Sequence, residues 1–371
     1  MRIKSQSGDG QLQYLKVAAL TAGWNAPSAR FRVRQYRYAL AEHGVSLREH
    51  CPFVNQMIQL PGILGRVRRR YIFPWLFVQT LMNIIARIPA FFAARQADVT
   101  LINRSIIPGL EECVALLPKP RVLDVDDAIW LTDPRGAASA ARLAQRVDAV
   151  IVGNEHLAKW YRNHNGRVYV VPTAVDTRRY LPRQLSRHTE GSMCTIGWMG
   201  TDGNFPHLDL VKSAIEAVLN DRSNTRMLVV SNLRPSGWKF DNDRLVFRAW
   251  SAATELRDLQ DMDIGLMPLR DDEWARGKCS FKMLQYLAVG IPVVVSPVGM
   301  NADVLNGADV GFGAYSESDW VSSLHNLIDD EALRRWKGGN GRQLVERKYS
   351  TEFVAARLAA TLREIDIGKT C

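Results

Sequence analysis

The sequence lacks the features of a disulfide-rich, secreted or membrane-spanning protein. Its 371 residues include only five cysteines, which lie far apart and never at a metal-binding or redox spacing. An odd number of scattered cysteines fits a reducing compartment. Residues 1–14 have no apolar core and resemble a flexible tail rather than a signal peptide. We therefore expect a cytoplasmic protein.

Long hydrophobic runs are also missing, because no stretch reaches the about 18 uninterrupted apolar residues of a membrane span. The least polar segment, 71–94, has polar and proline interruptions and follows four arginines between positions 66 and 70. Basic residues beside aromatic ones can hold a helix on an anionic bilayer, whereas ordinary core helices explain the same pattern. Peripheral contact with an anionic membrane surface, at the inner face of the membrane, is therefore one of two interpretations.

Charge is unbalanced, with 48 lysines and arginines against 38 acidic residues and a net charge of +10. This excess attracts nucleotides, acidic lipids or nucleic acids without choosing among them. No zinc spacing or RNP-type aromatic strand accompanies it, so we expect no nucleic-acid partner. A non-enzymatic protein that binds anionic lipid or nucleic acid is a competing interpretation, and the arginines at 66–70 are its best support.

Short β-branched runs alternate with helical stretches twice along the chain. The first series of expected strands lies at 17–20, 45–50, 99–102, 122–125, 149–152 and 168–171. The second series lies at 195–198, 226–230, 245–249, 264–267 and 293–295. Such alternation predicts parallel sheets with helices on both faces, so the expected fold class is α/β with two Rossmann-like domains.

The expected domains span 15–178 and 193–350 and are joined by a polar linker at 179–192. Residues 351–371 are expected to form a C-terminal helix that packs back on the first domain. Ligands of open parallel sheets bind outside the carboxyl ends of the strands. The functional residues should therefore face a cleft between the domains.

The run KCSFKMLQYLAVGIPVVVSPVGMNADVL at 278–305 is the most informative part of the sequence. Ser280 is a favourable N-cap for the helix that follows, and Gly290 ends that helix. Lys278 and Lys282 flank the helix start, where a cation is unfavourable unless an anion is bound. The turn after the next strand directs further backbone N–H groups to the same place. This pattern predicts a phosphate site, and the alternative is a helix and strand that only pack, with both lysines solvated.

Four segments resemble the GT-B glycosyltransferases, specifically the large retaining group called family 4, and the resemblance covers most of the chain. They are VVPTAVDTRRYLP at 170–182, TIGWMGTDGN at 195–204, DIGLMPL at 263–269 and GKCSFKMLQYLAVGIPVVVSPVG at 277–299. The resemblance implies retaining transfer of a sugar from a UDP- or GDP-linked donor on the second domain to a hydroxyl acceptor on the first. It implies no cofactor, no obligatory metal, and a carbohydrate, lipid-linked or small-molecule acceptor in glycoconjugate biosynthesis.

The resemblance also assigns donor-side roles to matching positions. Gly200 and Thr201 would approach the donor phosphates, and Lys278 and Lys282 would neutralise the diphosphate leaving group as catalytic residues. The remaining donor contacts would come from Ser280, Phe281, Gln285, Gly299, Met300 and Asn301.

The paired glutamates of the family would fall on Gly277 and Gln285, and neither position is Glu here. A neutral glutamine can still bond a ribose diol, at roughly half the strength of a charged acceptor. Because Gly277 has no side chain, the backbone at 299–301 or the acids at 271–273 would contact the donor sugar instead.

Polar residues also follow the expected strands of the first domain. The acceptor-side candidates are Arg30, Arg32, Arg104 and Asn154. Asp126 and Asp127 end the strand at 122–125, and either carboxylate can align the acceptor hydroxyl or take its proton as a catalytic residue. Alternatively, these acids cap the next helix or pair with Arg30 or Arg32, and Asn154 caps the helix that follows it.

A literal D-x-D, Asp124-Val125-Asp126, raises the alternative of a metal-dependent transferase. Such a site holds its cation with oxygen ligands and needs a nucleotide pocket in the first half of the chain. The phosphate-binding pattern lies in the second half, so we expect no metal ligands. His207, in the loop after the expected strand 195–198, is a further candidate close to the donor.

Overall fold

The computed structural model describes residues 14–52, 72–105, 110–132, 134–183, 193–239 and 243–368, with the backbone alone for 72–80. Residues 1–13 of the expected tail at 1–14, the arginines at 66–70 and most of the expected linker, at 184–192, lie outside the described residues. Among the helices that the structure describes, none is long and apolar enough to cross a membrane.

The first sheet has six parallel strands in the order β2-β1-β3-β4-β5-β6. They are β1 (Leu15–Leu20), β2 (Val45–His50), β3 (Val99–Asn103), β4 (Arg121–Val125), β5 (Ala149–Val152) and β6 (Val168–Val170). Val17 pairs with Val99, and Val122 pairs with Ala149. Both faces of the central strands β3, β4 and β5 are buried, which explains their continuous apolar sequences. The six expected strands are confirmed.

The second sheet also has six parallel strands, in the order β12-β11-β10-β7-β8-β9. They are β7 (Cys194–Met199), β8 (Thr225–Ser231), β9 (Leu245–Ala249), β10 (Ile264–Met267), β11 (Val293–Val295) and β12 (Gly311–Gly313). The first five were expected, whereas β12 was not, because glycine has little strand propensity. A Cβ at Gly311 would lie 2.0 Å from the carbonyl oxygen of Val293, so the pairing of β12 with β11 requires glycine there.

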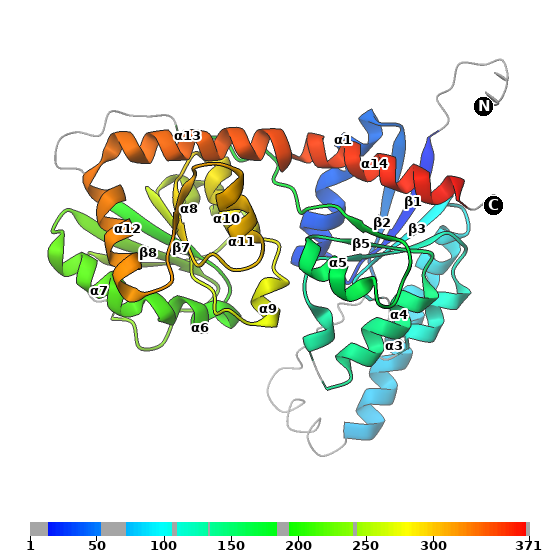
Figure 1. Ribbon diagram of the computed structural model, residues 1–371. Coiled ribbons are helices and arrows are strands. Elements are labelled where there is room, and N and C mark those ends of the chain that lie inside the picture. The colour runs from blue at the N-terminus through cyan, green and yellow to red at the C-terminus, as the bar shows by residue number, and fades with distance from the viewer. Residues whose placement is uncertain are drawn as a thin grey trace.

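Helices cover the faces of both sheets (Figure 1). The first domain contains the turns η1 (Ala29–Val33), η2 (Arg34–Tyr36), η3 (Glu111–Leu116) and η4 (Ile129–Leu131), and the helices α1 (Arg37–Glu42), α3 (Ile72–Ala94), α4 (Gly136–Arg146) and α5 (Glu155–Tyr161). The second contains η5 (Asp202–Asn204), α6 (Phe205–Leu208), η6 (Asp209–Val211), α7 (Lys212–Asp221), α8 (Glu255–Gln260), α9 (Glu273–Arg276), α10 (Phe281–Ala288), α11 (Met300–Gly307), α12 (Glu317–Asp329) and α13 (Glu331–Lys348).

The last helix, α14 (Thr351–Ile367), belongs spatially to the first domain. Figure 1 shows α13 along the second domain and α14 continuing over the first. Its apolar residues Val354, Leu358 and Leu362 are buried in one cluster with Val17 and Leu40. The chain therefore crosses between the domains twice.

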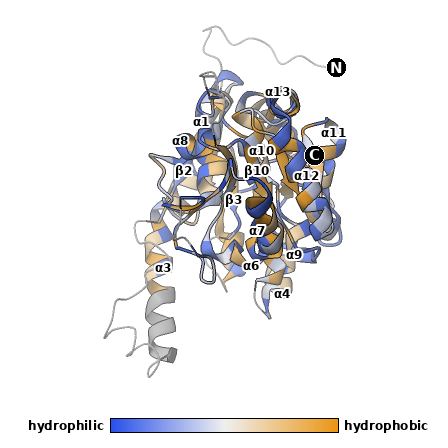
Figure 2. Cartoon of the chain, turned by 90° about the vertical axis from the view of Figure 1, so that its left-hand side faces the viewer, coloured by the Kyte–Doolittle hydropathy of each residue, from blue (hydrophilic) through white to orange (hydrophobic). Residues whose placement is uncertain are grey.

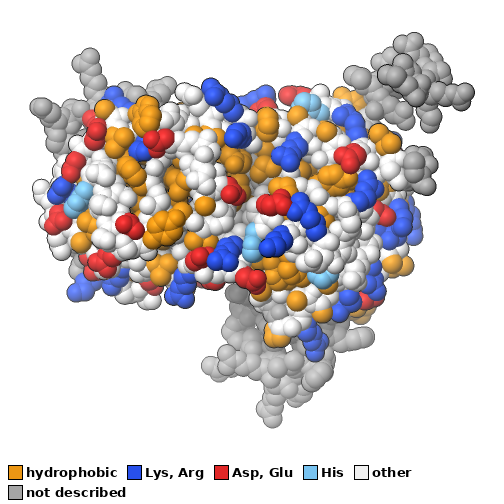
Figure 3. All heavy atoms as spheres, viewed as in Figure 1, with side chains coloured by type: hydrophobic (Ala, Val, Ile, Leu, Met, Phe, Trp, Pro, Cys, Tyr) orange, Lys and Arg blue, Asp and Glu red, His pale blue; other side chains and the backbone are white. Residues whose placement is uncertain are grey.

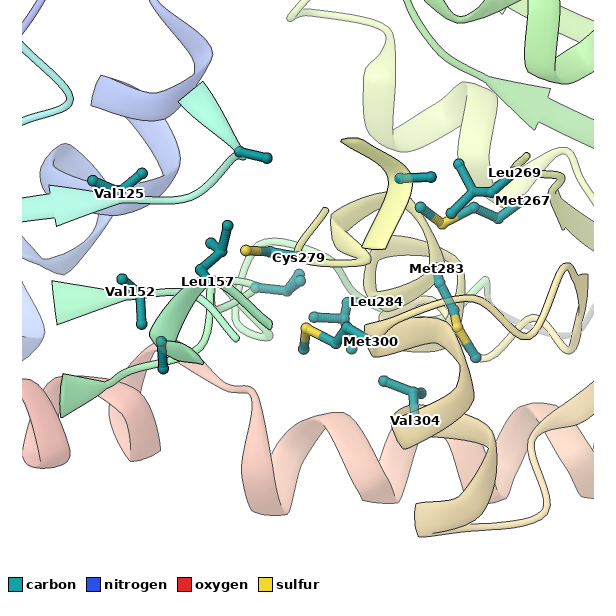
Figure 4. Packing of buried hydrophobic residues seen from close by; sticks show 14 of the residues in the cluster. Val125, Val152, Leu157, Met267, Leu269, Cys279, Met283, Leu284, Met300 and Val304 are labelled. Carbon is teal, nitrogen blue, oxygen red and sulfur yellow. The ribbon is translucent and has the colours of Figure 1, made fainter. Parts of the chain in front are cut away.

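The two crossings are hydrogen-bonded to each other. The Val175 N–H donates to the Tyr349 carbonyl at 2.8 Å, and the Thr351 N–H donates to the Val175 carbonyl at 3.2 Å. A single hydrophobic cluster also extends through both domains, and Figure 4 shows Val152 and Leu157 of the first domain near Cys279 and Leu284 of the second. The domains are therefore packed against each other along the cleft.

Candidate active site

A cavity of about 810 Å³ lies between the carboxyl ends of the two sheets, which is where parallel strands place a ligand. The predicted site residues that line it are Arg30, Arg104, Asp126, Asp127, Gly200, Thr201, Lys278, Ser280, Phe281 and Lys282. Those that do not line it are Arg32, Asn154, Gln285, Gly299, Met300 and Asn301. On the face in Figure 3, basic and acidic side chains are mixed. Among the described residues, no large patch of one charge sign is visible on this face.

The loop before α10 brings an unpaired cation to a helix start. The Lys278 ammonium lies 5.5 Å from the ring centre of Trp274 and forms no ion pair with the residues that the structure describes. Ser280 occupies the N-cap position, but its Oγ donates to Asn301 Oδ1 at 2.7 Å and no side chain caps α10. The prediction that the Ser280 side chain caps this helix is therefore wrong. A cation beside uncapped N–H groups suits an anion.

Lys282 is held by a buried network that joins the domains. Its Nζ donates to Gln285 Oε1 at 3.1 Å, and the Gln285 amide donates to Tyr180 Oη at 3.0 Å. Tyr180 Oη donates to Glu255 at 2.7 Å, and Arg30 forms an ion pair with that carboxylate at 2.7 Å. Gln285 is fully buried and has partners at both ends of its amide. Its predicted donor contact is therefore corrected: Gln285 supports Lys282.

The charges of this network shift one another's pKa values. Burial lowers the pKa of Lys282, against the opposing effect of Glu255, and Arg30 lowers it further. Burial alone would raise the pKa of Glu255, but the hydrogen bond from Tyr180 and the charges of Lys282 and Arg30 outweigh it and hold that pKa below its usual value. The Glu255 carboxylate is therefore ionised in the same network as the half-buried Lys282.

Gly299, Met300 and Asn301 lie behind the loop 276–280 and not in the cavity. A Cβ at Gly299 would lie 2.7 Å from the carbonyl oxygen of Arg276, and Met300 and Asn301 are buried. The Asn301 amide donates to the Ser296 carbonyl at 3.0 Å while its oxygen accepts from Ser280. The donor contacts predicted for these three residues are therefore corrected: the residues lie outside the cavity and support the loop 276–280.

Gly200 and Thr201 line the cavity at the end of β7. A Cβ at Gly200 would lie 2.5 Å from the Trp198 ring, and its N–H donates to the Val230 carbonyl at 3.1 Å. That N–H is therefore not free for a phosphate. The Thr201 hydroxyl accepts from the Asn204 amide at 2.9 Å.

His207 also lines this wall, where its Nδ1 accepts from the Arg270 N–H at 3.2 Å. Burial lowers the pKa of His207, and Lys278 lowers it further. A neutral imidazole is therefore favoured next to the lysine, and the structure places His207 on the expected donor side of the cavity.

Arg104 donates hydrogen bonds to both acidic candidates of the first domain, Asp126 and Asp127. Its Nε donates to Asp126 Oδ1 at 2.8 Å, and its Nη2 bonds Asp127. Burial raises the pKa of Asp127, and Asp126 raises it further, while Arg104 and Lys278 oppose the rise. Asp127 therefore holds a proton at higher pH than a free aspartate, which brings it closer to the range of a general base.

Two backbone positions that line the cavity are strained. Among the described non-glycine residues, only Arg104 and Ser280 have positive φ, at 66° and 49°. Such conformations cost on the order of 1–3 kcal/mol each and cluster at functional sites. Both residues line the cavity, one from each domain, so the strain marks this cavity as the site.

The predicted acceptor contact of Arg32 is corrected, because Arg32 forms a buried ion pair with Asp124 of the D-x-D sequence. The Arg32 guanidinium bonds both oxygens of Asp124 and donates to the Val171 carbonyl at 2.8 Å, and Asn103 donates to Asp124 at 3.0 Å. Arg32 is 3% exposed, so it supports the strand ends and does not contact an acceptor. Asp124 lies outside the cavity, and among the described residues no group of three or more His, Cys, Asp or Glu could hold a metal.

Asn154 caps α5, as one interpretation of the sequence predicted, because its Oδ1 accepts from the Leu157 N–H at 2.9 Å. Its amide nitrogen donates to the second domain and not into the cavity. Its predicted acceptor contact is therefore corrected. Arg30 does line the cavity, but its guanidinium is paired with Glu255, which is a partner that the sequence did not indicate.

Glu255, Trp24 and Trp250 are among the cavity residues that sequence reasoning missed. Glu255 carried no signal, because nothing in its local sequence shows a partner 225 positions away. Trp24 and Trp250 are 69% and 39% exposed in loops after strands, and exposed tryptophans there were a usable signal. The Arg34 guanidinium lies over the Trp24 ring, 4.0 Å from its centre, so one face of this exposed ring is held by a cation.

Comparison with solved structures gives the class of fold. Sucrose-phosphate synthase from Thermosynechococcus elongatus has 14% identity and a TM-score of 0.65, over 95% of this chain and 99% of that one. Anabaena HepE in complex with UDP and glucose has 13% identity and a TM-score of 0.62, over 94% and 100%.

WaaG, a glycosyltransferase involved in lipopolysaccharide biosynthesis, has 14% identity and a TM-score of 0.60, over 92% and 98%. No family model matches the sequence, and no curated protein matches it. The chain therefore has the GT-B fold, with two parallel-sheet domains facing a cleft, which confirms the expected architecture.

Proposed function

We propose that the protein is a glycosyltransferase that moves a sugar from a nucleotide-sugar to a hydroxyl acceptor. One observation carries this proposal: Lys278 and Lys282 at the start of α10 face the cluster of Arg104, Asp126 and Asp127 across one cavity between the domains. Groups that bind an anion on one wall and a candidate base on the other are the parts that glycosyl transfer needs.

Each side chain then has a task that its position allows. Lys278, Lys282 and the uncapped α10 N–H groups stabilise the negative charge that develops on the leaving diphosphate. Asp127 aligns the acceptor hydroxyl or takes its proton, and Arg104 orients Asp127. Because the bond to the diphosphate breaks on the same face that the acceptor approaches, the leaving phosphate itself can assist that proton transfer.

The finer features of the reaction are also proposals. We infer a UDP- or GDP-linked donor, retention of configuration, no obligatory metal, and an acceptor that carries a sugar ring for the exposed ring of Trp24. The family 4 resemblance of the α10 segment supports retention, and the complex of HepE with UDP and glucose supports the donor class. The ion pair between Arg32 and Asp124 supports a reaction without a D-x-D metal.

A panel of UDP- and GDP-sugars tests this function directly. We expect at least one donor to raise the melting temperature and to be consumed when oligosaccharide or lipid-linked acceptors are added, with the same rate in excess chelator. Loss of activity in chelator would favour the metal-dependent alternative. Failure of every donor to bind would contradict the transferase proposal and favour a protein that only binds anionic lipid or nucleic acid.

We further propose that α3 attaches the protein peripherally to an anionic bilayer. Its Ile85, Ile88 and Phe92 are 48%, 46% and 60% exposed, while the alanines at positions 86, 90 and 94 face the core. Figure 1 shows α3 extending from the first domain, and Figure 2 shows hydrophobic residues on its coloured part. An exposed row of large apolar residues in a chain of net charge +10 suits the interface of an acidic membrane.

Vesicle binding tests this attachment. The double variant Ile85→Glu/Ile88→Glu should bind phosphatidylglycerol vesicles about tenfold more weakly than the wild type, because it places charge in the apolar face. The control Tyr315→Glu, at an exposed aromatic residue of the second domain, should bind normally. Equal binding of all three proteins in a co-sedimentation assay would contradict the proposal.

A further inference from the structure

The loop 277–279 of the second domain is inserted into the first domain. The Asn154 amide nitrogen donates to the carbonyl oxygens of Gly277 and Lys278, at 3.0 Å each. The Cys279 thiol donates to the Asp126 carbonyl at 3.1 Å. The loop that carries Lys278 is therefore bonded to the segment that carries Asp126 and Asp127.

The shapes of the two surfaces are closely matched. A Cβ at Gly277 would lie 2.8 Å from the Ala128 Cβ, and a Cβ at Gly153 would lie 2.1 Å from the Cys279 sulfur. Figure 4 shows Cys279 between Leu157 of the first domain and the helix of Leu284 in the second. We call the receiving surface, formed by Asp126, Ala128, Gly153 and Asn154, the socket. It leaves no room for the glutamate that the resemblance places at 277.

We propose that Asn154 is a positioning residue that holds the loop 277–279 in the socket and so fixes Lys278 opposite Asp127 during sugar transfer. This inference rests on the proposed transferase function for its kinetic consequence. The docked state itself needs no substrate, because it is defined by the contacts between the domains.

Asn154 uses its two side-chain atoms for different purposes. Its oxygen caps α5, whereas its nitrogen holds the loop. Aspartate and serine both cap helices well, but neither provides the amide donor. Asn154→Asp and Asn154→Ser therefore keep the cap and remove the two bonds to the loop. Asn163→Asp is the matched control, because Asn163 is an exposed residue just after the same helix.

Steady-state kinetics give the first readout. Two lost hydrogen bonds should lower the ratio of docked to undocked loop about 100-fold, from about ten to about one tenth, so the docked population falls about tenfold and the undocked population rises about tenfold. We expect Asn154→Asp and Asn154→Ser to lower kcat about tenfold with little change in the donor KM, and Asn163→Asp to behave as the wild type. Wild-type kcat in both Asn154 variants would overturn the proposal, as would an equal loss in Asn163→Asp.

Thiol labelling gives the second readout and needs no activity. Burial raises the pKa of Cys279 in the docked loop, so its thiol should react slowly. In both Asn154 variants we expect about tenfold faster alkylation of Cys279 by N-ethylmaleimide, followed by peptide mass spectrometry. Cys194, buried in the second sheet, reports global unfolding and should stay protected. Unchanged Cys279 labelling would overturn the proposal even if no donor supports transfer.

A steric pair tests the socket from the other side. Gly277→Ala should release the loop, because the new methyl group meets Ala128. Ala128→Gly in the same chain removes that contact and should restore most of the lost protection of Cys279. Wild-type labelling in Gly277→Ala, or no recovery in the double variant, would show that the contact between Gly277 and Ala128 does not govern the loop and would overturn the proposal.

Discussion

Replacing Lys282 with alanine is expected to lower kcat for sugar transfer by about 100-fold or more, because an electrostatic stabiliser of the leaving diphosphate is lost. The lysine lies in the cavity wall and is held by Gln285 at 3.1 Å. Folding should change little, since Arg30 still neutralises Glu255 at 2.7 Å. Steady-state rates and the melting temperature, measured together, separate the two effects.

Two companion variants identify the charge as the cause. Lys282→Met keeps most of the volume and should lose as much activity as alanine, whereas Lys212→Ala, on the surface of α7, should lose none. Burial lowers the pKa of Lys282, so its cation is lost as pH rises through that lowered value. Wild-type activity should therefore fall on the alkaline side at lower pH than a free lysine would cause. A wild-type rate in Lys282→Ala would contradict the role of α10.

Replacing Asp127 with asparagine is expected to lower kcat by about 100-fold, which is typical for loss of a general base. Asp126→Asn should cost less, about tenfold, because that carboxylate mainly holds Arg104 in place. Equal losses in the two variants would contradict this division of roles and would indicate that both aspartates only anchor Arg104.

The pH profile tests the same role independently. Burial and Asp126 raise the pKa of Asp127, so the ionised base is lost as pH falls through a value above that of free aspartate. The acid limb of kcat should therefore lie at higher pH than about 3.9. Asp127→Asn should remove this limb from its residual activity, and a limb that persists unchanged would assign it to another group.

The sheets could be predicted because their signal is local. Valine and isoleucine runs such as 149–152 and 293–295 form strands that are buried on both faces whatever their neighbours are. Lys278 and Lys282 could be predicted for a similar reason. A lysine at a helix N-terminus is unusual, and both the lysines and the helix start can be recognised within a few residues of sequence. The strand β12 was not predicted, because its glycine at position 311 is required only by close contact with the carbonyl of Val293, which the local sequence does not show.

The supports of the site could not be predicted because each depends on a distant partner. Arg32 was expected at an acceptor, yet a carboxylate 92 positions away holds it in the interior. Gln285, Gly299 and Asn301 lie in the expected segment, but their contacts turn them away from the cavity. Local sequence gives the segment that carries a site, and tertiary contacts decide which of its side chains face a ligand.

The packing of α14 has a consequence for the order in which the chain folds during synthesis. The second domain is built from one continuous stretch, whereas the first needs Val354, Leu358 and Leu362 to cover Val17 and Leu40. During synthesis, the apolar surface around Val17 and Leu40 therefore stays uncovered until α14 has been made. We therefore expect the first domain to be completed only after the second domain has been made, unlike the usual order in which the N-terminal domain folds first. A helix that follows the whole second domain in the sequence completes the domain that precedes it.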